Sequence, residues 1–157
     1  MTPESSIEVV RATVEDLPLI VPLFDRYRQF YKYESDVEGA QRFLQAHFAE
    51  NSSVIFLALG VDEQGERQAW GFTQLYPSFS SAALKRLWIL NDLFVAPQAR
   101  RVGVGRALLE CARVFAEETQ ARGLTLQTAV DNYPAQTLYE AAGWKREEQF
   151  YSYHLYF

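Results

Sequence analysis

Short apolar runs alternate along this chain with longer segments in which apolar residues recur at helical spacing. The short runs are bounded by turn residues and predict strands. They occupy residues 7–11, 53–59, 68–76, 87–95 and 124–130. Two closing strands are expected around residues 144–147 and 149–157, and the second of these segments is rich in aromatic residues.

Helical spacing predicts two helices between the first strand and the second. Thr13 followed by Asp16 predicts a capping box at the start of a helix that reaches about Tyr31. Ser35 and Glu38 repeat the pattern before a second helix.

A third helix begins at the glycine pair near position 104 and ends at Gly123. Its apolar stripe and its charged face, with opposite charges three and four positions apart, are typical of a surface helix. Asn132 predicts the cap of a short fourth helix, with Pro134 in its first turn and Gly143 after its end.

The expected order of elements is β-α-α-β-β-β-α-β-α-β-β. This order is typical of a mixed α/β domain in which helices cover the sheet. The length of 157 residues, without a linker or a repeat, predicts a single domain over 1–157.

Composition narrows the classes of partner. The net charge of −5 argues against nucleic acid as the main partner. No stretch approaches the roughly 20 apolar residues that span a membrane, and the start M-T-P-E-S-S lacks the features of a secretion signal. One cysteine, Cys111, fits a reducing compartment. We therefore expect a cytoplasmic protein.

The segment R-R-V-G-V-G-R, residues 100–106, is the clearest candidate for a ligand-binding site. It connects an apolar strand to a helix, and glycines there let the backbone approach a ligand closely. The first turn of a helix offers free N–H groups and the positive end of the dipole. A pyrophosphate could lie across this turn, although a solvated glycine-rich connection is an equal alternative on these residues alone.

Two other glycine-rich motifs do not fit this segment. A dinucleotide-binding fingerprint needs a third glycine and a place at the first strand. A Walker A loop needs a lysine followed by serine or threonine after its last glycine. Neither is present here.

The segment L-F-V-A-P-Q-A-R-R-V-G-V-G-R-A-L-L resembles the coenzyme-A motif of the GCN5-related N-acetyltransferases, the GNAT superfamily. A second segment, D-N-Y-P-A-Q-T-L-Y-E-A-A-G-W, resembles that family's next motif at its usual distance. The resemblance implies a GNAT-type, mostly antiparallel central sheet flanked by helices, and acetyl-CoA as acetyl donor without a metal.

The resemblance also implies which residues contact the coenzyme. The pyrophosphate would lie on the turn that Arg100 begins. The pantetheine arm would bond the backbone of the preceding strand, and the second motif would add two contacts, one of which, Asn132, is equally a helix cap. These cofactor-binding residues are Leu93, Phe94, Val95, Arg100, Arg101, Val102, Gly103, Val104, Gly105, Arg106, Asn132 and Ala135.

By the same resemblance, Tyr139 occupies the position of the catalytic tyrosine that faces the coenzyme sulfur; the alternative is a core tyrosine. Asp92 is a candidate for general base or substrate orientation, or for a structural hydrogen bond at a strand bulge. Spermidine/spermine acetyltransferases, which this strand resembles, typically carry Glu-Asp where this chain has Asn91 and Asp92. The Asn-Asp pair looks similar to that of the yeast histone and D-amino-acid acetyltransferase group.

The acceptor wall in this family comes from the first two helices and from the loop before the long strand. The substrate-binding candidates are Tyr31, Glu34, Tyr76 and Asn91, with Asp36, Phe79 and Ser80 beside them. Glu34 and Asp36 are alternatively helix-cap acids. His47 and His154 lack partners at metal-ligand spacing, so no metal site is expected, and Cys111 is expected to be a core residue.

The expected function is transfer of acetyl from acetyl-CoA to a primary amine of a small molecule or a peptide, by direct attack in a ternary complex. The alternative is a non-catalytic sensor that binds acyl-CoA. The aromatic final strand predicts a homodimer, because exposed aromatic edges usually find a partner. Neither nucleic acid nor membrane is an expected partner.

Overall fold

The computed structural model describes residues 7–157. The segment M-T-P-E-S-S, on which the expectation about a secretion signal rests, lies outside the described residues. The chain divides into two compact units, Met1–Gln127 and Thr128–Phe157, so the single domain stays a prediction. Within 7–157 no helix is both long and apolar enough to cross a membrane.

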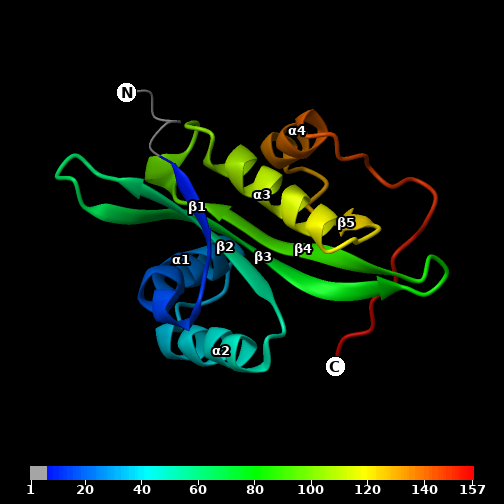
Figure 1. Cartoon of the computed structure of the whole chain (residues 1–157), viewed down its shortest axis with the longest axis horizontal. Coiled ribbons are helices and arrows are strands. Elements are labelled where there is room, and N and C mark those ends of the chain that lie inside the picture. The colour runs from blue at the N-terminus through cyan, green and yellow to red at the C-terminus, as the bar shows by residue number, and fades with distance from the viewer. Residues whose placement is uncertain (1–6) are drawn as a thin grey trace. The chain divides into compact units, whose positions relative to one another are not determined.

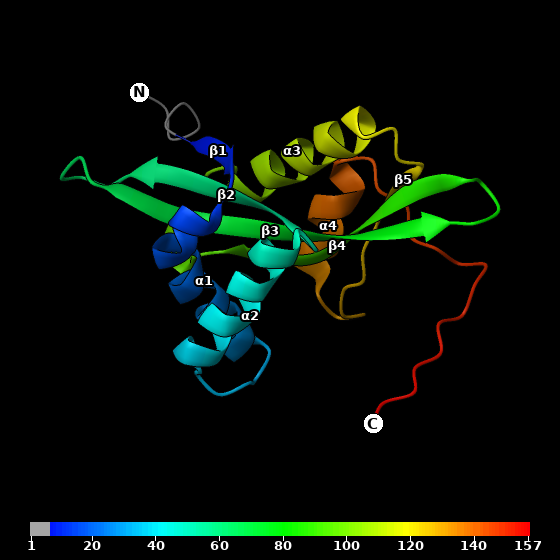
Figure 2. The same ribbon diagram turned by 60° about the horizontal axis from the view of Figure 1, so that its bottom comes forward.

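The first unit is a five-stranded sheet with helices on both faces. Its strands lie in the order β1-β2-β3-β4-β5, antiparallel except for the parallel pair β4–β5. Helices α1 and α2 cover one face and α3 the other (Figures 1 and 2). This is the predicted mixed, mostly antiparallel fold. The elements are β1 (Glu8–Arg11), α1 (Leu17–Phe30), α2 (Val37–Glu50), β2 (Val54–Val61), β3 (Arg67–Ser80), β4 (Lys85–Val95), α3 (Val104–Glu118) and β5 (Gly123–Thr125).

The start of α1 follows the predicted capping box, and the start of α2 does not. The Thr13 N–H donates to the Asp16 carboxylate at 2.8 Å, and a short 3-10 turn leads into α1. At α2 the cap is Asp36, whose Oδ1 accepts the Gly39 N–H at 2.8 Å. The predicted cap at Ser35 is wrong, because its hydroxyl donates instead to Asp25 of α1 at 2.6 Å.

The main core lies between the sheet and the α1/α2 layer. Side chains of α1, such as Ile20 and Phe24, pack against Leu57 of β2 and Phe72 of β3. On the other face, α3 packs close to the strands at Gly71. A Cβ on Gly71 would lie 2.7 Å from the Phe94 carbonyl oxygen, so this glycine lets α3 and the adjoining strands approach closely.

Two strands differ in length from their prediction. The expected loop P-S-F-S-S-A-A is largely strand, because β3 continues to Ser80 and pairs with β4 as far as Ser80 opposite Lys85. Pro77 lies opposite Trp88 of β4, but β2 stops pairing with β3 at Leu75, so this end of β3 is an edge strand, where proline is tolerated. The strand expected over 124–130 is only β5, since its ladder with β4 ends at Ile89 opposite Thr125.

The second unit contains one helix, α4 (Tyr133–Ala141). Asn132 caps it by accepting the Ala135 N–H at 3.3 Å, and Gly143 follows its end with a φ of 93°, both as predicted. The two closing strands are not formed: residues 144–157 carry no regular secondary structure. Their β-forming residues have no ladder partner among the described residues, and a strand needs one.

Asp25 joins α1 to the segment that leads into α2. Its carboxylate, 5% exposed, accepts hydrogen bonds from the Ser35 hydroxyl and from the Asp36 N–H at 2.8 Å. Burial by itself raises the pKa of Asp25, but these bonds, the nearby Arg28 and the Gln29 amide outweigh burial and leave the pKa below its ordinary value.

Because its pKa is lower folded than unfolded, Asp25 stabilises the fold above its unfolded pKa of about 3.9, and this contribution disappears as pH falls through the folded value. We expect Asp25→Asn to lower the free energy of unfolding by about 1.5–3 kcal/mol at pH 7. The difference from wild type should shrink below pH 4 in urea titrations. Glu63→Gln, at an exposed turn residue, is the control, and an equal pH dependence in both variants would contradict the assignment.

Candidate active site

A β-bulge in β4 determines which way Asp92 points. The β3–β4 register shifts between Gln74 and Leu75: Gln74 lies opposite Asp92 and Leu75 opposite Leu90, which leaves Asn91 as the extra residue. Side chains two apart on a strand share a face. Trp88, whose indole N–H donates to Thr119 at 2.9 Å, therefore faces the region after α3, while Asp92 faces α1 and α2. Without the extra residue both side chains would share one face.

The Asp92 carboxylate is buried and held by neutral groups. Only 5% of the residue is exposed. Gln74 Nε2 donates to Oδ2 at 2.7 Å, and Asn91 Nδ2 donates to Oδ1 at 3.1 Å. The Ser53 hydroxyl donates in turn to Gln74 Oε1 at 2.8 Å. The structural hydrogen bond at a bulge that the sequence suggested for Asp92 is therefore present, and its catalytic role stays a prediction.

The negative charge of Asp92 contributes to raised pKa values of two tyrosines. Burial first, and then the negative charge of Asp92 and a side-chain hydrogen bond to it, raise the pKa of Tyr27 far above 10. Burial and the same charge raise the pKa of Tyr76. Both hydroxyls therefore stay protonated at neutral pH and can only donate or accept hydrogen bonds there.

The edge of β4 beyond the bulge is open on the side of β5. The parallel ladder joins residues 87–89 to residues 123–125, and β5 ends there. Residues 90–95 consequently have β3 as their single neighbouring strand among the described residues. A strand with one neighbour leaves backbone groups available to an extended ligand.

The register shows which backbone groups of this edge are available. The Ala96 N–H donates to the Trp70 carbonyl at 2.8 Å, so the position opposite Trp70 is a hydrogen-bonded pair. In an antiparallel pair, hydrogen-bonded and non-hydrogen-bonded residues alternate along each strand. Phe94 is therefore the next residue of β4 whose backbone bonds to β3, and the backbone groups of Leu93 and Val95 point away from β3. Of the three predicted pantetheine contacts, Leu93 and Val95 have backbone groups that point to the open edge, whereas the backbone groups of Phe94 bond to β3.

The turn between β4 and α3 presents a row of backbone amides. Gly103 caps α3 with a φ of 90°, and Arg101 also has a positive φ, 66°. The first bond of the helix runs from the Ala107 N–H to the Gly103 carbonyl at 3.0 Å. The amides of residues 104–106 precede that bond and are free of intrahelical partners. The turn therefore has the free amides that the sequence predicted, and anion binding there stays a prediction.

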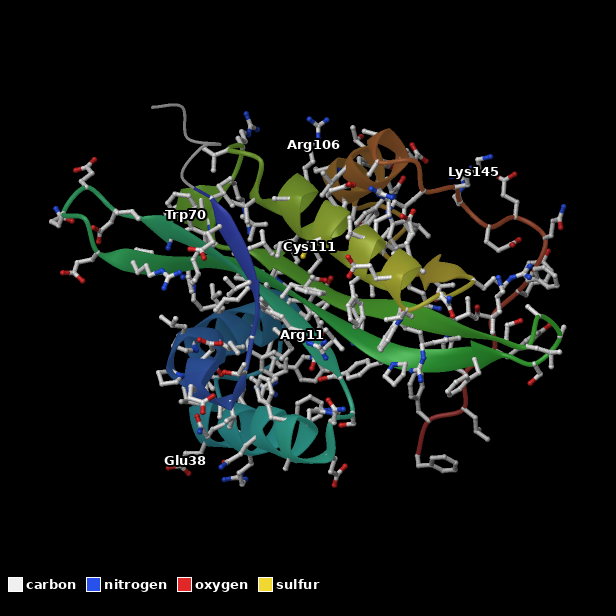
Figure 3. The ribbon with its side chains drawn as sticks, viewed as in Figure 1. Arg11, Glu38, Trp70, Arg106, Cys111 and Lys145 are labelled. Atoms are coloured by element: carbon white, nitrogen blue, oxygen red, sulfur yellow. The ribbon has the colours of Figure 1, made fainter. Side chains whose placement is uncertain are left out.

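The three arginines of the turn differ in what they contact. Arg100 Nε donates to the Val95 carbonyl at 3.2 Å, so this side chain ties the turn back to the open edge of β4. Arg101 and Arg106 are exposed, and Arg106 extends from the first turn of α3 away from the sheet (Figure 3). Arg100 is exposed as well, so all three cations are accessible to an anion at the helix N-terminus.

The predicted acceptor residues are only partly brought together. The Tyr31 ring lies 5.0 Å from that of Tyr27, and Tyr76 is on the face of Asp92. Asp36 is engaged as the cap of α2, as one alternative held, while Glu34 lies before that cap. Phe79, three residues from Tyr76, is on the opposite face and stacks under Arg86 with Trp88, so its expected place in the acceptor wall is wrong.

Other candidate residues have structural surroundings. Burial raises the pKa of the Cys111 thiol, which agrees with a packing role. Within residues 7–157 no group of three or more His, Cys, Asp and Glu side chains could hold a metal ion. In the second unit the Tyr139 ring lies 6.1 Å from the Trp144 ring.

Sequence reasoning missed Tyr27 and Gln74, although both contact the Asp92 carboxylate or feel its charge. Tyr27 reads as one more apolar position of α1, and Gln74 as a residue inside an apolar strand. A buried glutamine in a core strand needs a hydrogen-bond partner, and that requirement was the available signal for Gln74.

The fold is that of an enzyme of the acetyltransferase class. The model of the acetyltransferase (GNAT) family matches residues 20–144. The chain belongs to this family and is an acetyltransferase.

Three proteins illustrate the similarity. The uncharacterized N-acetyltransferase YhfO of Bacillus subtilis (strain 168) is 45% identical, over 94% of this chain and 95% of that protein. The D-amino-acid N-acetyltransferase HPA3 of Saccharomyces cerevisiae is 30% identical, over 82% of this chain and 79% of that protein. The crystal structure of a probable acetyltransferase is 43% identical with a TM-score of 0.87, over 96% of this chain and 97% of that one.

Proposed function

We propose that the protein transfers acetyl from acetyl-CoA to a primary amine by direct attack within a ternary complex. The observation that carries the proposal is the juxtaposition of three features in the first unit. An anion-binding helix N-terminus follows an open strand edge, and a buried carboxylate, Asp92, lies on the same strand. The helix N-terminus and the open edge suit a coenzyme, and the carboxylate suits an ammonium group.

The residues of the turn fit the phosphates of coenzyme A. The amides of residues 101–106, the helix dipole and the exposed Arg101 and Arg106 are complementary to a pyrophosphate. The outward backbone groups of Leu93 and Val95 suit an extended amide-containing arm added as a strand. Acetyl-CoA supplies the activated acetyl thioester; the protein's own groups bind and orient it.

Gly103 offers a sharp test of this coenzyme site. A Cβ at its φ of 90° strains the backbone of the turn whose amides would hold the pyrophosphate. We expect Gly103→Ala to weaken coenzyme A binding about 10-fold, measured by calorimetry, which corresponds to 1.4 kcal/mol. Gly65→Ala is a matched control, because Gly65 also has a positive φ, 81°, but lies in the β2–β3 turn. Equal binding by both variants would contradict the assignment.

Asp92 is the proposed group that orients the amine and accepts its proton. An alkyl ammonium has a pKa near 10.4, so about 4 kcal/mol separates it from the neutral amine at pH 7. Asp92 attracts the ammonium and takes a proton from it, directly or through water. Asn91 cannot act as a base, and it instead donates a hydrogen bond to Asp92.

Tyr139 is the proposed hydrogen-bond donor to the coenzyme sulfur as negative charge develops there. A phenol of pKa about 10 is a weaker acid than a thiol of about 8.5, so full proton transfer from Tyr139 is uphill by about 2 kcal/mol. The proton that leaves the attacking nitrogen can protonate the sulfur instead. Tyr139 therefore stabilises charge and does not need to ionise.

The test of the proposed function is release of free coenzyme A from acetyl-CoA in the presence of amines. The panel contains polyamines, L- and D-amino acids, aminoglycosides and lysine peptides. Tyr139→Phe should keep coenzyme affinity and lower kcat about 100-fold, while Tyr133→Phe, at an exposed tyrosine in the same helix, should match wild type. Tight coenzyme binding without turnover on any amine would favour the alternative, an acyl-CoA sensor.

We also propose that the protein is a homodimer. The aromatic and aliphatic side chains of residues 150–157 are largely exposed, with Phe150 at 78% and Tyr156 at 84%. Exposed apolar residues in such number favour an interface between copies. Sedimentation should give a dimer for the full chain and a monomer after replacement of Phe150, Tyr151, Tyr153 and Tyr156 by serine. A monomeric wild-type protein at 100-fold varied concentration would contradict the proposal.

A further inference from the structure

The acids on the α1/α2 side of the sheet are not equally available to a substrate. Asp25 accepts hydrogen bonds from Ser35, Asp36 and Gln29, so both of its carboxylate oxygens already have partners within the fold. The carboxylate of Asp36 caps α2. Asp92 differs from both, because all of its side-chain donors are the neutral groups already described and none of them belongs to a helix cap or a backbone turn.

Asp92 lacks a cationic partner among the described residues. The ion pairs of residues 7–157 involve other acids: Glu8, Asp25, Glu110, Glu117 and Glu148. Removing a carboxylate from water without an opposite charge is unfavourable. A single ammonium group from a ligand would compensate this charge.

The surroundings of Asp92 are aromatic. Tyr27 and Tyr76 both feel its charge. The Tyr31 ring lies against Tyr27 at 5.0 Å, and the His47 ring lies 5.4 Å from that of Tyr76. Phe43 extends this row, with its ring 4.5 Å from that of His47. Such a wall favours a cation next to an apolar body.

Among the described residues of the first unit, no arginine, lysine or histidine forms an ion pair with Asp92. Arg26 and Arg28 flank Tyr27 in α1. Arg26 donates to the Gln98 side-chain oxygen at 3.4 Å. Arg28 donates to the Glu34 carbonyl at 3.0 Å, lies 3.9 Å from Asp25 and stacks over Tyr33. Both arginines therefore have partners within the fold. A carboxylate on the substrate would lie near Asp92 without compensation, and like charges repel.

We infer that the acceptor is a monocationic primary amine with an apolar body and without a carboxylate. The inference rests on the proposed function and specifies its substrate class. Amino acids are disfavoured because they bring a second negative charge beside Asp92. Diamines, polyamines and aminoglycosides are disfavoured because they carry additional ammonium groups. Each of these groups would lose its hydration against the aromatic side chains, and no second buried carboxylate is free to compensate its charge.

The test compares amines that differ by one group. Phenethylamine, phenylalaninamide and both enantiomers of phenylalanine share one aromatic body, and only phenylalanine carries the carboxylate. Hexylamine and 1,6-diaminohexane differ by one ammonium group. We expect kcat/KM for phenethylamine and phenylalaninamide to exceed that for phenylalanine at least 10-fold, and hexylamine to exceed the diamine by a similar factor.

Asp92→Asn separates a charge effect from a structural one. The variant removes the negative charge and keeps the shape, so the ratio of kcat/KM between phenethylamine and phenylalanine should fall toward 1. A purely structural role for Asp92 would lower both values equally and leave that ratio unchanged, which would overturn the inference. Glu50→Gln removes one exposed negative charge at the end of α2 and should keep the wild-type ratio.

The remaining outcomes are also distinguishable. Equal or higher kcat/KM for phenylalanine or for the diamine would overturn the inference while leaving the proposed acetyltransfer to amines in place. Absence of coenzyme A release with every amine, including spermidine, kanamycin and a lysine peptide, would overturn the proposed function and the inference together.

Discussion

The extra residue in β4 is the constraint on which the site depends. One inserted position, Asn91, changes which face of the sheet the following side chains occupy. Trp88 before it packs near the end of α3, and Asp92 after it enters the α1/α2 layer. Without the bulge the carboxylate would lie under α3, away from the tyrosines whose pKa values it raises.

The same strand also connects the two parts of the proposed site. Beyond Ile89, β4 has lost β5 as a neighbour, so its backbone groups at Leu93 and Val95 are turned to an open edge. The strand then leads directly into the turn that Gly103 caps. A single segment thereby carries a buried carboxylate, an open edge and a helix N-terminus with free amides. This is the order that the proposed acceptor amine, pantetheine arm and pyrophosphate would require.

Burying Asp92 has a cost that the surrounding network reduces. Gln74, Asn91 and Ser53 supply neutral hydrogen bonds, and each of these bonds is weaker than an ion pair in a buried site. The fold therefore holds a charge that it has not neutralised. Such a group is typical of a site that completes its electrostatics with a ligand.

Local patterns in the sequence determined the helices, most strands, the glycine turn before α3 and the family, because caps, periodicity and glycine positions act over a few neighbouring residues. The tertiary structure alone decided the rest. Pairing set the lengths of β3 and β5, since a strand ends where its ladder ends. The bulge brought Tyr27, Gln74 and Asp92 together from three separate elements, and no local pattern encodes a register shift between two strands.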